Sequence, residues 1–235
     1  MKAKKIFRST WFIALVVVVL LALGGFLAYT FGLPTYREWR YDRLMQMARE
    51  PYEAGDLNNA HLAVRKTVRM YPERADAWRL AVEIAEAGEF QSARWQYLLR
   101  LTDLDPEALE PRLDLIEMAM RAGQLEFARE NLEEIAPRAE ESVRYHELAF
   151  NYHSLGEDWE AAERHMEQLI ALQPEDARSV FDLAVVRLQQ DDPQTKQEGL
   201  EALRKIIANH PEMEAMGQRA IIIHAVGTRN EALAQ

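Results

Sequence analysis

The strings GDLNNA (residues 55–60), GEFQSA (88–93), GQLEFA (123–128) and GEDWEAA (156–162) recur along this chain. Their glycines lie 33, 35 and 33 residues apart, and each string separates two stretches with apolar residues at helical spacing. A repeat of about 34 residues marks a stack of helical hairpins, none of which can bury its apolar face alone. The spacing therefore predicts an all-α solenoid, and it favours a binding scaffold over an enzyme.

These strings resemble the glycine turns of the tetratricopeptide repeat family, and the resemblance extends from about residue 41 to the end of the chain. In that family's unit of about 34 residues, small side chains let two helices approach closely and large apolar ones fill the space between hairpins. The resemblance implies a right-handed α-solenoid. Its units span about 41–74, 74–107, 109–142, 142–176 and 177–213, with a partial sixth unit at 214–235.

Individual units depart from the family pattern. Pro51 stands where an aromatic residue is usual, and it should kink or shorten the first helix of its unit. In the third unit, Ile116 occupies a small-residue position and Pro137 comes early. In the fifth unit, Gly199 replaces the usual alanine and the turn is lengthened through DDPQTKQ (191–197).

The sixth unit begins with the same spacing, and Gly227 falls at its turn position. The sequence then ends at Gln235, barely into the expected second helix. Terminal repeats normally carry a polar capping helix, because an open hairpin face exposes core side chains to water. We therefore expect the chain to continue beyond residue 235, or a partner to cover this end.

The composition is that of a globular protein, with 28% charged and 49% hydrophobic residues. Cysteine is absent, which excludes disulfides, thiolate metal sites, cysteine nucleophiles and a lipid-modified N-terminal cysteine. The formal net charge is −10, although Lys2, Lys4, Lys5 and Arg8 all precede the first acid, Glu38. Such an acidic body should repel nucleic acid, so we expect no nucleic-acid partner.

An uncharged segment follows Arg8, and its apolar part runs from Trp11 to Phe31. A helix over this part is about 31 Å long, which matches a hydrocarbon layer about 30 Å thick. We therefore expect a membrane-spanning helix that contacts the lipid bilayer. Ahead of the repeats, the sequence divides into a basic arm (1–10), a transmembrane helix (11–33) and a juxtamembrane linker (34–40).

A cleaved signal peptide is the alternative to this anchor. Its apolar region would usually be about 7–15 residues long and would end in small residues at the cleavage site. Ala22 and Gly24 could form such a site, but the hydrophobic run continues well past them. An uncleaved anchor therefore fits better, with Pro34 at or just beyond the end of its helix.

The charges beside the span predict its orientation. Four cations and no acid precede it, which favours a cytoplasmic N-terminus. Arg37, Arg40, Arg43 and Arg49 follow it and oppose that assignment. We expect a single-pass inner (plasma) membrane protein with its repeats outside the cytoplasm, in the periplasm of a Gram-negative bacterium. Repeats that face the cytoplasm are the alternative.

The sequence contains no catalytic or cofactor motif: a phosphate-binding glycine loop, GxGxxG, HExxH and GxSxG are all missing. We therefore expect no enzyme activity, no cofactor and no small-molecule substrate. His146 and His153 are seven residues apart and share a helix face, and His165 lies on the next helix. Three such histidines can bind zinc, but histidines are more often ordinary surface or groove residues, and we expect no metal.

In the repeat family, the first helix of each hairpin lines the concave surface of the solenoid. The partner-groove candidates that the resemblance implies are Trp78, Val82, Leu113, Glu117, Met120, His146, Phe150, His153, Arg178, Phe181 and Val185. This groove is more apolar and aromatic than charged, and it lacks the lysine, asparagine and arginine set with which some members hold a C-terminal carboxylate. It suits an amphipathic helix or an extended hydrophobic segment of a protein or peptide partner. Alternatively, any one of these side chains packs between hairpins.

An N-terminal anchor followed by helical hairpins resembles a group of bacterial proteins that assist protein translocation, cytochrome maturation, or assembly of envelope polysaccharide and secretion machinery. The resemblance implies a membrane-anchored scaffold for an envelope, secretion or polysaccharide complex. The alternative is a recruiting or regulatory arm of an enzyme whose catalytic domain lies beyond residue 235.

Overall fold

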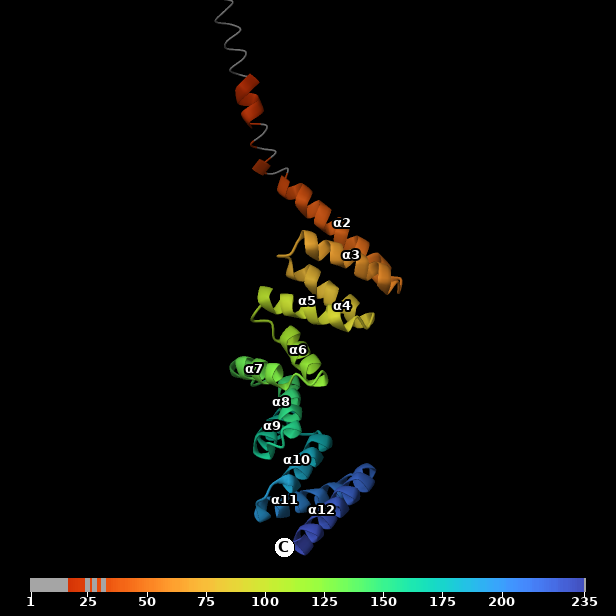
Figure 1. The fold of residues 1–235 in the computed structure, drawn as a ribbon, viewed down its shortest axis with the longest axis vertical. Coiled ribbons are helices and arrows are strands. Elements are labelled where there is room, and N and C mark those ends of the chain that lie inside the picture. The colour runs from red at the N-terminus through yellow and green to blue at the C-terminus, as the bar shows by residue number, and fades with distance from the viewer. Residues whose placement is uncertain (1–16, 24–25, 27–28, 31–32, 235) are drawn as a thin grey trace, which may run out of the picture. The chain divides into compact units, whose positions relative to one another are not determined.

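The computed structural model describes residues 17–23, 26, 29–30 and 33–234, which are helical apart from short turns and contain no strand (Figure 1). The chain divides into two compact parts, here named the N-terminal block (up to Asp105) and the C-terminal block (from Pro106). The prediction of all-helical hairpin repeats is confirmed for the described residues.

The predicted membrane span lies largely outside these residues. Within 11–33 the structure describes only 17–23, 26, 29–30 and 33, and the basic arm at 1–10 is not described. Among the helices that are described, none combines the length and the apolar character needed to cross a bilayer.

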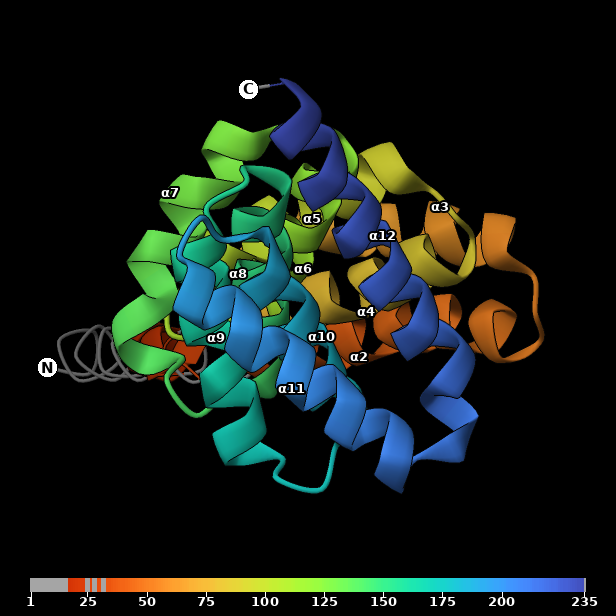
Figure 2. The same ribbon diagram turned by 90° about the horizontal axis from the view of Figure 1, so that it is seen from below.

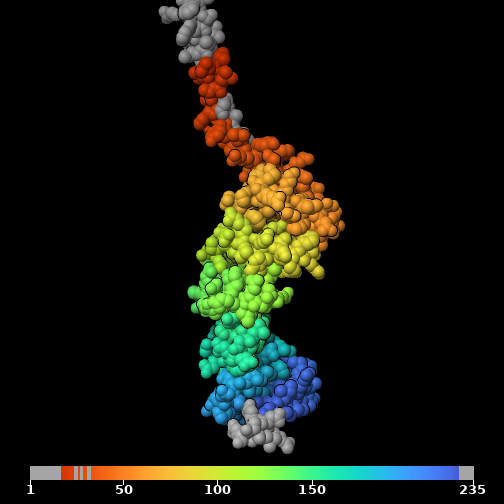
Figure 3. All heavy atoms as spheres, viewed as in Figure 1, coloured from red at the N-terminus to blue at the C-terminus, as the bar shows by residue number. Residues whose placement is uncertain are grey.

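The N-terminal block contains two hairpins, in which each helix packs against the next along the chain. The first pairs α2 (Leu33–Glu53) with α3 (Leu57–Met70), and the second pairs α4 (Ala75–Ala87) with α5 (Gln91–Leu104). The space-filling view shows the atoms of the second hairpin lying directly on those of the first (Figure 3).

The C-terminal block continues the same pattern. Its helices are α6 (Leu109–Arg121), α7 (Leu125–Ile135), α8 (Val143–Leu155), α9 (Trp159–Leu172), α10 (Ala177–Gln189), α11 (Pro193–Asn209) and α12 (Glu214–Ala234), with single 3-10 turns η2 (Ala136–Arg138) and η3 (Pro211–Met213). Three hairpins therefore precede α12, which packs on α11 and α10; Figure 2 shows α11 and α12 diverging from the turn that joins them.

Small side chains lie where the helices approach closely. Alanine has no side-chain entropy to lose and leaves room for a facing helix, so it suits both the helix and the contact. The alanines at these contacts that are completely buried are Ala48, Ala60, Ala81, Ala128, Ala162 and Ala184. Ile116, which replaces a small residue in the third unit, is completely buried as well.

The hairpin turns use two backbone patterns. Gly55 and Gly123 adopt the left-handed conformation themselves, with φ of +78° and +70°. In the other two turns the left-handed residue is the glutamate that follows the glycine: Glu89 has a φ of +55° and Glu157 one of +56°. Because a side chain disfavours this conformation, packing of the two flanking helices must stabilise it.

The predicted linker at 34–40 is helical. Residues 33–40 form the first turns of α2, with Pro34 at its beginning, where the fixed φ of proline suits a helix and no N–H is needed. Pro51 lies in the last turn of α2, which ends two residues later.

The turn expected at Gly227 in the partial sixth unit (214–235) is not found in the described residues. α12 passes through Gly227 without a turn and continues to Ala234. A glycine inside a helix costs only about 1 kcal/mol, so α12 can continue through it. Ile222, Ile223 and Val226 on α12 are exposed.

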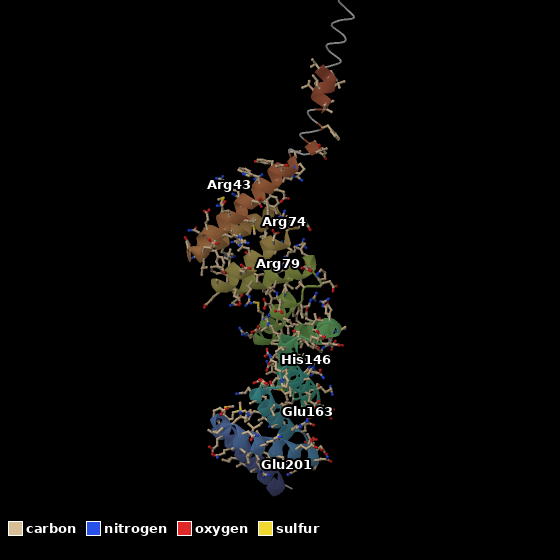
Figure 4. All side chains as sticks on the ribbon, turned by 180° about the vertical axis from the view of Figure 1, so that it is seen from behind. Arg43, Arg74, Arg79, His146, Glu163 and Glu201 are labelled. Atoms are coloured by element: carbon tan, nitrogen blue, oxygen red, sulfur yellow. The ribbon has the colours of Figure 1, made fainter. Side chains whose placement is uncertain are left out.

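Arginines with several carboxylate partners lie at three hairpin junctions. Arg74, at the start of α4, contacts Glu38 of α2 at 2.8 Å and Asp76 at 3.3 Å, and its guanidinium lies 3.9 Å from the ring centre of Tyr41. Figure 4 labels Arg74 at this contact. The junction is thus bridged by charge as well as by apolar packing.

The C-terminal block repeats this arrangement twice. Arg144 of α8 contacts three carboxylates of α6: Glu110 at 2.8 Å, Asp114 at 2.5 Å and Glu117 at 2.9 Å. Arg187 of α10 contacts Glu163 of α9 at 2.6 Å, together with Glu167 of α9 and Glu198 of α11 at 3.1 and 4.0 Å. An exposed ion pair adds about 0–1 kcal/mol, and these half-buried networks are less screened by salt.

Gly199 lies where α11 packs closely against α10, so a larger side chain there should lower stability. A β-carbon at this position would lie 2.8 Å from the Ala184 carbonyl oxygen and 3.1 Å from the Arg187 β-carbon. We therefore expect Gly199→Ala to lower the free energy of unfolding by about 1–3 kcal/mol through overpacking, measured by urea denaturation.

The matched control is Gly227→Ala in α12, where a β-carbon meets nothing within 4 Å. Alanine should raise stability there by about 0.5–1 kcal/mol through helix propensity. Equal stability of the Gly199→Ala variant and the parent protein would contradict the close contact between α10 and α11.

Candidate functional site

The structure buries four of the groove candidates. Val82, Leu113, His146 and Phe181 are between 0% and 8% exposed, so their side chains are core residues and do not line an open surface. The expectation that they face a partner is corrected here. Large side chains at these positions fill the space between neighbouring helices, which leaves them no access to solvent.

Two of the remaining candidates pack on buried clusters. Phe150 is half-buried against the cluster that Met166, Leu169 and Leu183 form. Val185 packs in the same way on the cluster around Phe181 and Leu203. Both side chains therefore contribute to packing before they are available to a partner.

Four candidates lie at or near the surface. Arg178 is exposed and pairs with Asp182 at 2.9 Å. Glu117 is half-buried and pairs with Arg121 and Arg144, while Met120 is half-buried. Trp78 is half-buried as well, and it lies in a pocket described below.

Charged residues stand one position after four of the candidates. They are Arg79 after Trp78, Asp114 after Leu113, Glu147 after His146 and Asp182 after Phe181; Arg79 and Glu147 are exposed, and the two aspartates are half-buried. One residue turns a side chain by about 100° around a helix, which is enough to exchange a core position for a surface one. Beside the buried candidates Leu113, His146 and Phe181, the side chain nearer the solvent is therefore a carboxylate.

A pocket of about 420 Å³ opens between α3 and α5, and we name it the α3–α5 pocket. Its lining residues are His61, Arg65, Val68, Arg69, Trp78, Ser92, Ala93, Gln96 and Tyr97. All of them belong to the N-terminal block, and Trp78 is the one contributed by α4.

Hydrogen bonds and ring contacts hold the aromatic side of this pocket in place. A hydrogen bond of 2.9 Å joins a ring nitrogen of His61 to the Tyr97 hydroxyl, and the His61 ring stacks on Phe90 at 4.5 Å. The Trp78 indole donates its N–H to the Pro72 carbonyl at 2.9 Å and lies 5.8 Å from the Tyr97 ring. The aromatic wall is thus preorganised.

The other side of the pocket is positively charged. Arg65 and Arg69 are exposed, and no carboxylate among the described residues pairs with either. Burial and the neighbouring Arg65 guanidinium lower the pKa of His61, and burial raises the pKa of Tyr97. At neutral pH both rings are therefore uncharged, and the two guanidinium groups supply the charge of the pocket.

Sequence reasoning found only Trp78 of this pocket, because it searched the first helix of each hairpin. A signal for the other residues was present in the sequence. α3 has no acidic residue, although acids outnumber basic residues 38 to 28 in the whole chain, and it carries Arg65, Lys66 and Arg69. A helix without carboxylates in an acidic protein is a departure that composition alone could have detected.

The three histidines noted in the sequence come together in the C-terminal block. The Nδ1 atoms of His146 and His165 lie 3.0 Å apart, and the rings of His153 and His165 stack at 5.5 Å. Figure 4 labels His146 in this region. Among the described side chains, however, no group of three histidines, acids or cysteines has the arrangement of a metal site.

Hydrogen bonds connect this cluster. His146 Nε2 lies 2.9 Å from the Glu140 carbonyl oxygen, which can only accept, so this nitrogen donates. The Nδ1 atoms of His146 and His165 share the second hydrogen bond. Burial and the nearby His146 and His153 lower the pKa of His165 to about 4, so the His165 ring is neutral at pH 7.

Stability should consequently fall in mild acid. Below the unfolded pKa of about 6.5, the unfolded chain binds a proton at His165 that the folded chain does not bind until about pH 4. The free energy of unfolding should therefore decrease by up to about 3 kcal/mol between pH 7 and pH 4, and His165→Gln should flatten this part of the curve. Urea denaturation over this pH range measures the effect.

The control is His210→Gln, which alters a partly exposed histidine outside the cluster. The Nδ1 atom of His210 lies 3.2 Å from a carboxylate oxygen of Glu212. This variant should keep the acid-induced loss of the parent protein. If the parent and His165→Gln lost stability in parallel, the neutral, buried state of His165 would be refuted.

Comparison with known proteins identifies what this arrangement resembles. A family model described as tetratricopeptide repeat matches residues 45–109 and 155–214. No curated protein sequence matches the chain.

Among solved structures, a tetratricopeptide repeat protein from Parabacteroides merdae is similar, with a TM-score of 0.66 and 12% identity over 83% of this chain and 76% of that one. The MamA protein has a TM-score of 0.63 and 12% sequence identity, and the match covers 74% of this chain and 94% of MamA. YrrB is described as a TPR protein with an unusual peptide-binding site. It has a TM-score of 0.61 and 14% sequence identity, and the match covers 75% of this chain and 89% of YrrB. At these identities the likeness shows the fold.

Proposed function

Because the chain belongs to the tetratricopeptide repeat family, we propose that it is a non-catalytic scaffold that binds partner proteins and is anchored in a membrane by residues 11–33. The observation that carries the first part is the α3–α5 pocket, which combines a fixed aromatic wall with two arginines that have no carboxylate partner among the described residues. Aromatic residues and arginine are the side chains that dominate binding energy at protein interfaces.

The architecture supports a protein partner. Stacked hairpins form extended surfaces, and such surfaces recognise polypeptide segments rather than small molecules. YrrB, which has a similar fold, is described as having an unusual peptide-binding site. No catalytic motif occurs in the sequence, and the pocket contains no carboxylate that could act as a general base beside His61.

The exposed apolar side chains near the N-terminus support the membrane anchor. Residues 17–23 are helical and exposed; Val18 is 64% and Leu21 is 71% exposed. Leaving such side chains in water forgoes about 1.5–3 kcal/mol each relative to burial, whereas lipid would cover them. The uncharged sequence on both sides extends this apolar stretch to the length of a span.

The charge distribution supports an orientation and a setting. The basic arm at 1–10 would remain in the cytoplasm, and the repeats would lie outside it. We place the protein in the inner membrane of a bacterium, where it would hold components of an envelope, secretion or polysaccharide complex near the bilayer. This assignment rests on the order of anchor and repeats.

Deleting residues 11–33 should release the protein from membranes. The full chain should stay in the pellet after an alkaline carbonate wash, because a buried apolar helix is not extracted by pH or salt, and the deletion variant should stay in the supernatant. N-terminal sequencing of the membrane form should show an intact arm. Recovery of a form that starts after residue 24 would instead identify a cleaved signal peptide.

A photo-reactive amino acid at Gln96 should capture a discrete partner in intact membranes. Gln96 is exposed and lines the α3–α5 pocket, so the probe leaves the core unchanged. The matched control carries the same probe at exposed Arg204 of α11. A defined crosslinked band from Gln96 alone supports the scaffold, and the absence of any band specific to Gln96 contradicts it.

A further inference from the structure

We infer that the α3–α5 pocket binds an extended acidic segment of a partner protein, in which carboxylates alternate with apolar side chains. This inference rests on the proposed scaffold function and names the chemistry of the partner. It follows from three properties of the pocket: its unpaired cations, the absence of acids from its lining, and its aromatic wall.

The first property is the combination of unpaired arginines with a pocket. Several other arginines have carboxylate partners: Arg79 contacts Asp105 at 2.8 Å, Arg94 contacts Glu86 at 3.0 Å, and Arg112 contacts Glu134 at 2.7 Å. Arg65 and Arg69 line a pocket and have no such partner among the described residues. Two guanidinium groups on one helix face repel each other, and an incoming anion removes that cost.

The second property is that the pocket has no acidic side chain that could neutralise the two arginines. None of the residues that line the pocket is an aspartate or a glutamate, and α3 as a whole has neither. Acids exceed basic residues by ten in the chain, so the local positive potential is maintained against an acidic background. Complementary charge steers an acidic segment here and disfavours a basic one.

Geometry favours an extended segment. Arg65 and Arg69 are four residues apart on α3, which places their backbone positions about 6 Å apart along the helix axis. Alternate residues of an extended chain are about 6.6 Å apart and point to the same side. Two carboxylates in the pattern acid–x–acid therefore match the two arginines in spacing.

The aromatic wall accounts for the apolar part of the segment. Half-buried Trp78 supplies this surface, and a hydrogen bond to the Pro72 carbonyl holds its indole in place. Val68 and Tyr97 line the pocket too, but they are almost completely buried and support it from the core. A rigid apolar surface binds a side chain with little loss of conformational entropy. The residue beside the acidic pair would pack there.

The experiment measures binding of a short fluorescein-labelled peptide in which aspartate and leucine alternate, to the full chain in detergent. The control peptide carries asparagine in place of aspartate. We expect the aspartate peptide to bind, the asparagine peptide to bind at least about tenfold more weakly, and added salt to weaken the first much more than the second.

The double variant Arg65→Gln/Arg69→Gln should weaken binding of the aspartate peptide at least about tenfold. Both side chains are exposed, so helicity should be unchanged. The matched control is Arg204→Gln/Arg219→Gln, which removes the same charge from two exposed arginines without a carboxylate partner in the described structure and should leave affinity within about twofold.

Equal affinity for the two peptides, no binding to the parent protein, or equal loss in both double variants would overturn the inference. Heparin that binds as tightly as the aspartate peptide would also overturn it, because the pocket would then respond to charge alone. The Gln96 crosslink separates this outcome from failure of the scaffold. A Gln96-specific crosslink with no preference for aspartate refutes the acidic segment only, whereas its absence refutes the scaffold too.

Discussion

Within each block, burial of a hairpin's apolar face against its neighbour is the constraint on which the structure depends. A single pair of helices cannot cover its own apolar stripe. Completely buried alanines such as Ala60, Ala81 and Ala162 permit the close approach of the two helices within a hairpin. Gly199 shows the limit of that approach, since even a methyl group there would overlap the Ala184 carbonyl oxygen.

Charge is arranged around this packing in two ways. At the junctions, Arg74, Arg144 and Arg187 each bind more than one carboxylate, so an excess of acid is absorbed where hairpins meet. At the α3–α5 pocket the reverse holds, because Arg65 and Arg69 remain without a carboxylate partner in the described part of the chain. Arginine therefore stabilises the packing of hairpins at the junctions, whereas the arginines of the α3–α5 pocket are available to a ligand.

The fold was predictable from the sequence because turns and small residues recur in phase. The four glycine strings mark turns in the structure, and alanines at the expected spacing are buried. Gly227 was misleading, since a glycine permits a turn without requiring one. Only the packing of a second helix would have distinguished the two outcomes.

The candidate site was much less predictable. Positions carried over from the family placed Leu113 and His146 in a groove, yet both are core residues, and their neighbours Asp114 and Glu147 lie nearer the solvent. A rotation of about 100° per residue separates the two assignments, which is finer than hairpin periodicity can resolve. Trp78 was selected for the groove, but its indole faces a pocket between second helices.

The junction arginines have a mechanical consequence. Dissolved ions weaken their partly exposed bridges but leave the alanine contacts within each helix pair unaffected. Within each block, higher ionic strength should soften the joints between pairs before any pair itself comes apart. The stiffness of the joints between helix pairs then depends on the ionic strength of the solution, while the helix pairs themselves stay folded.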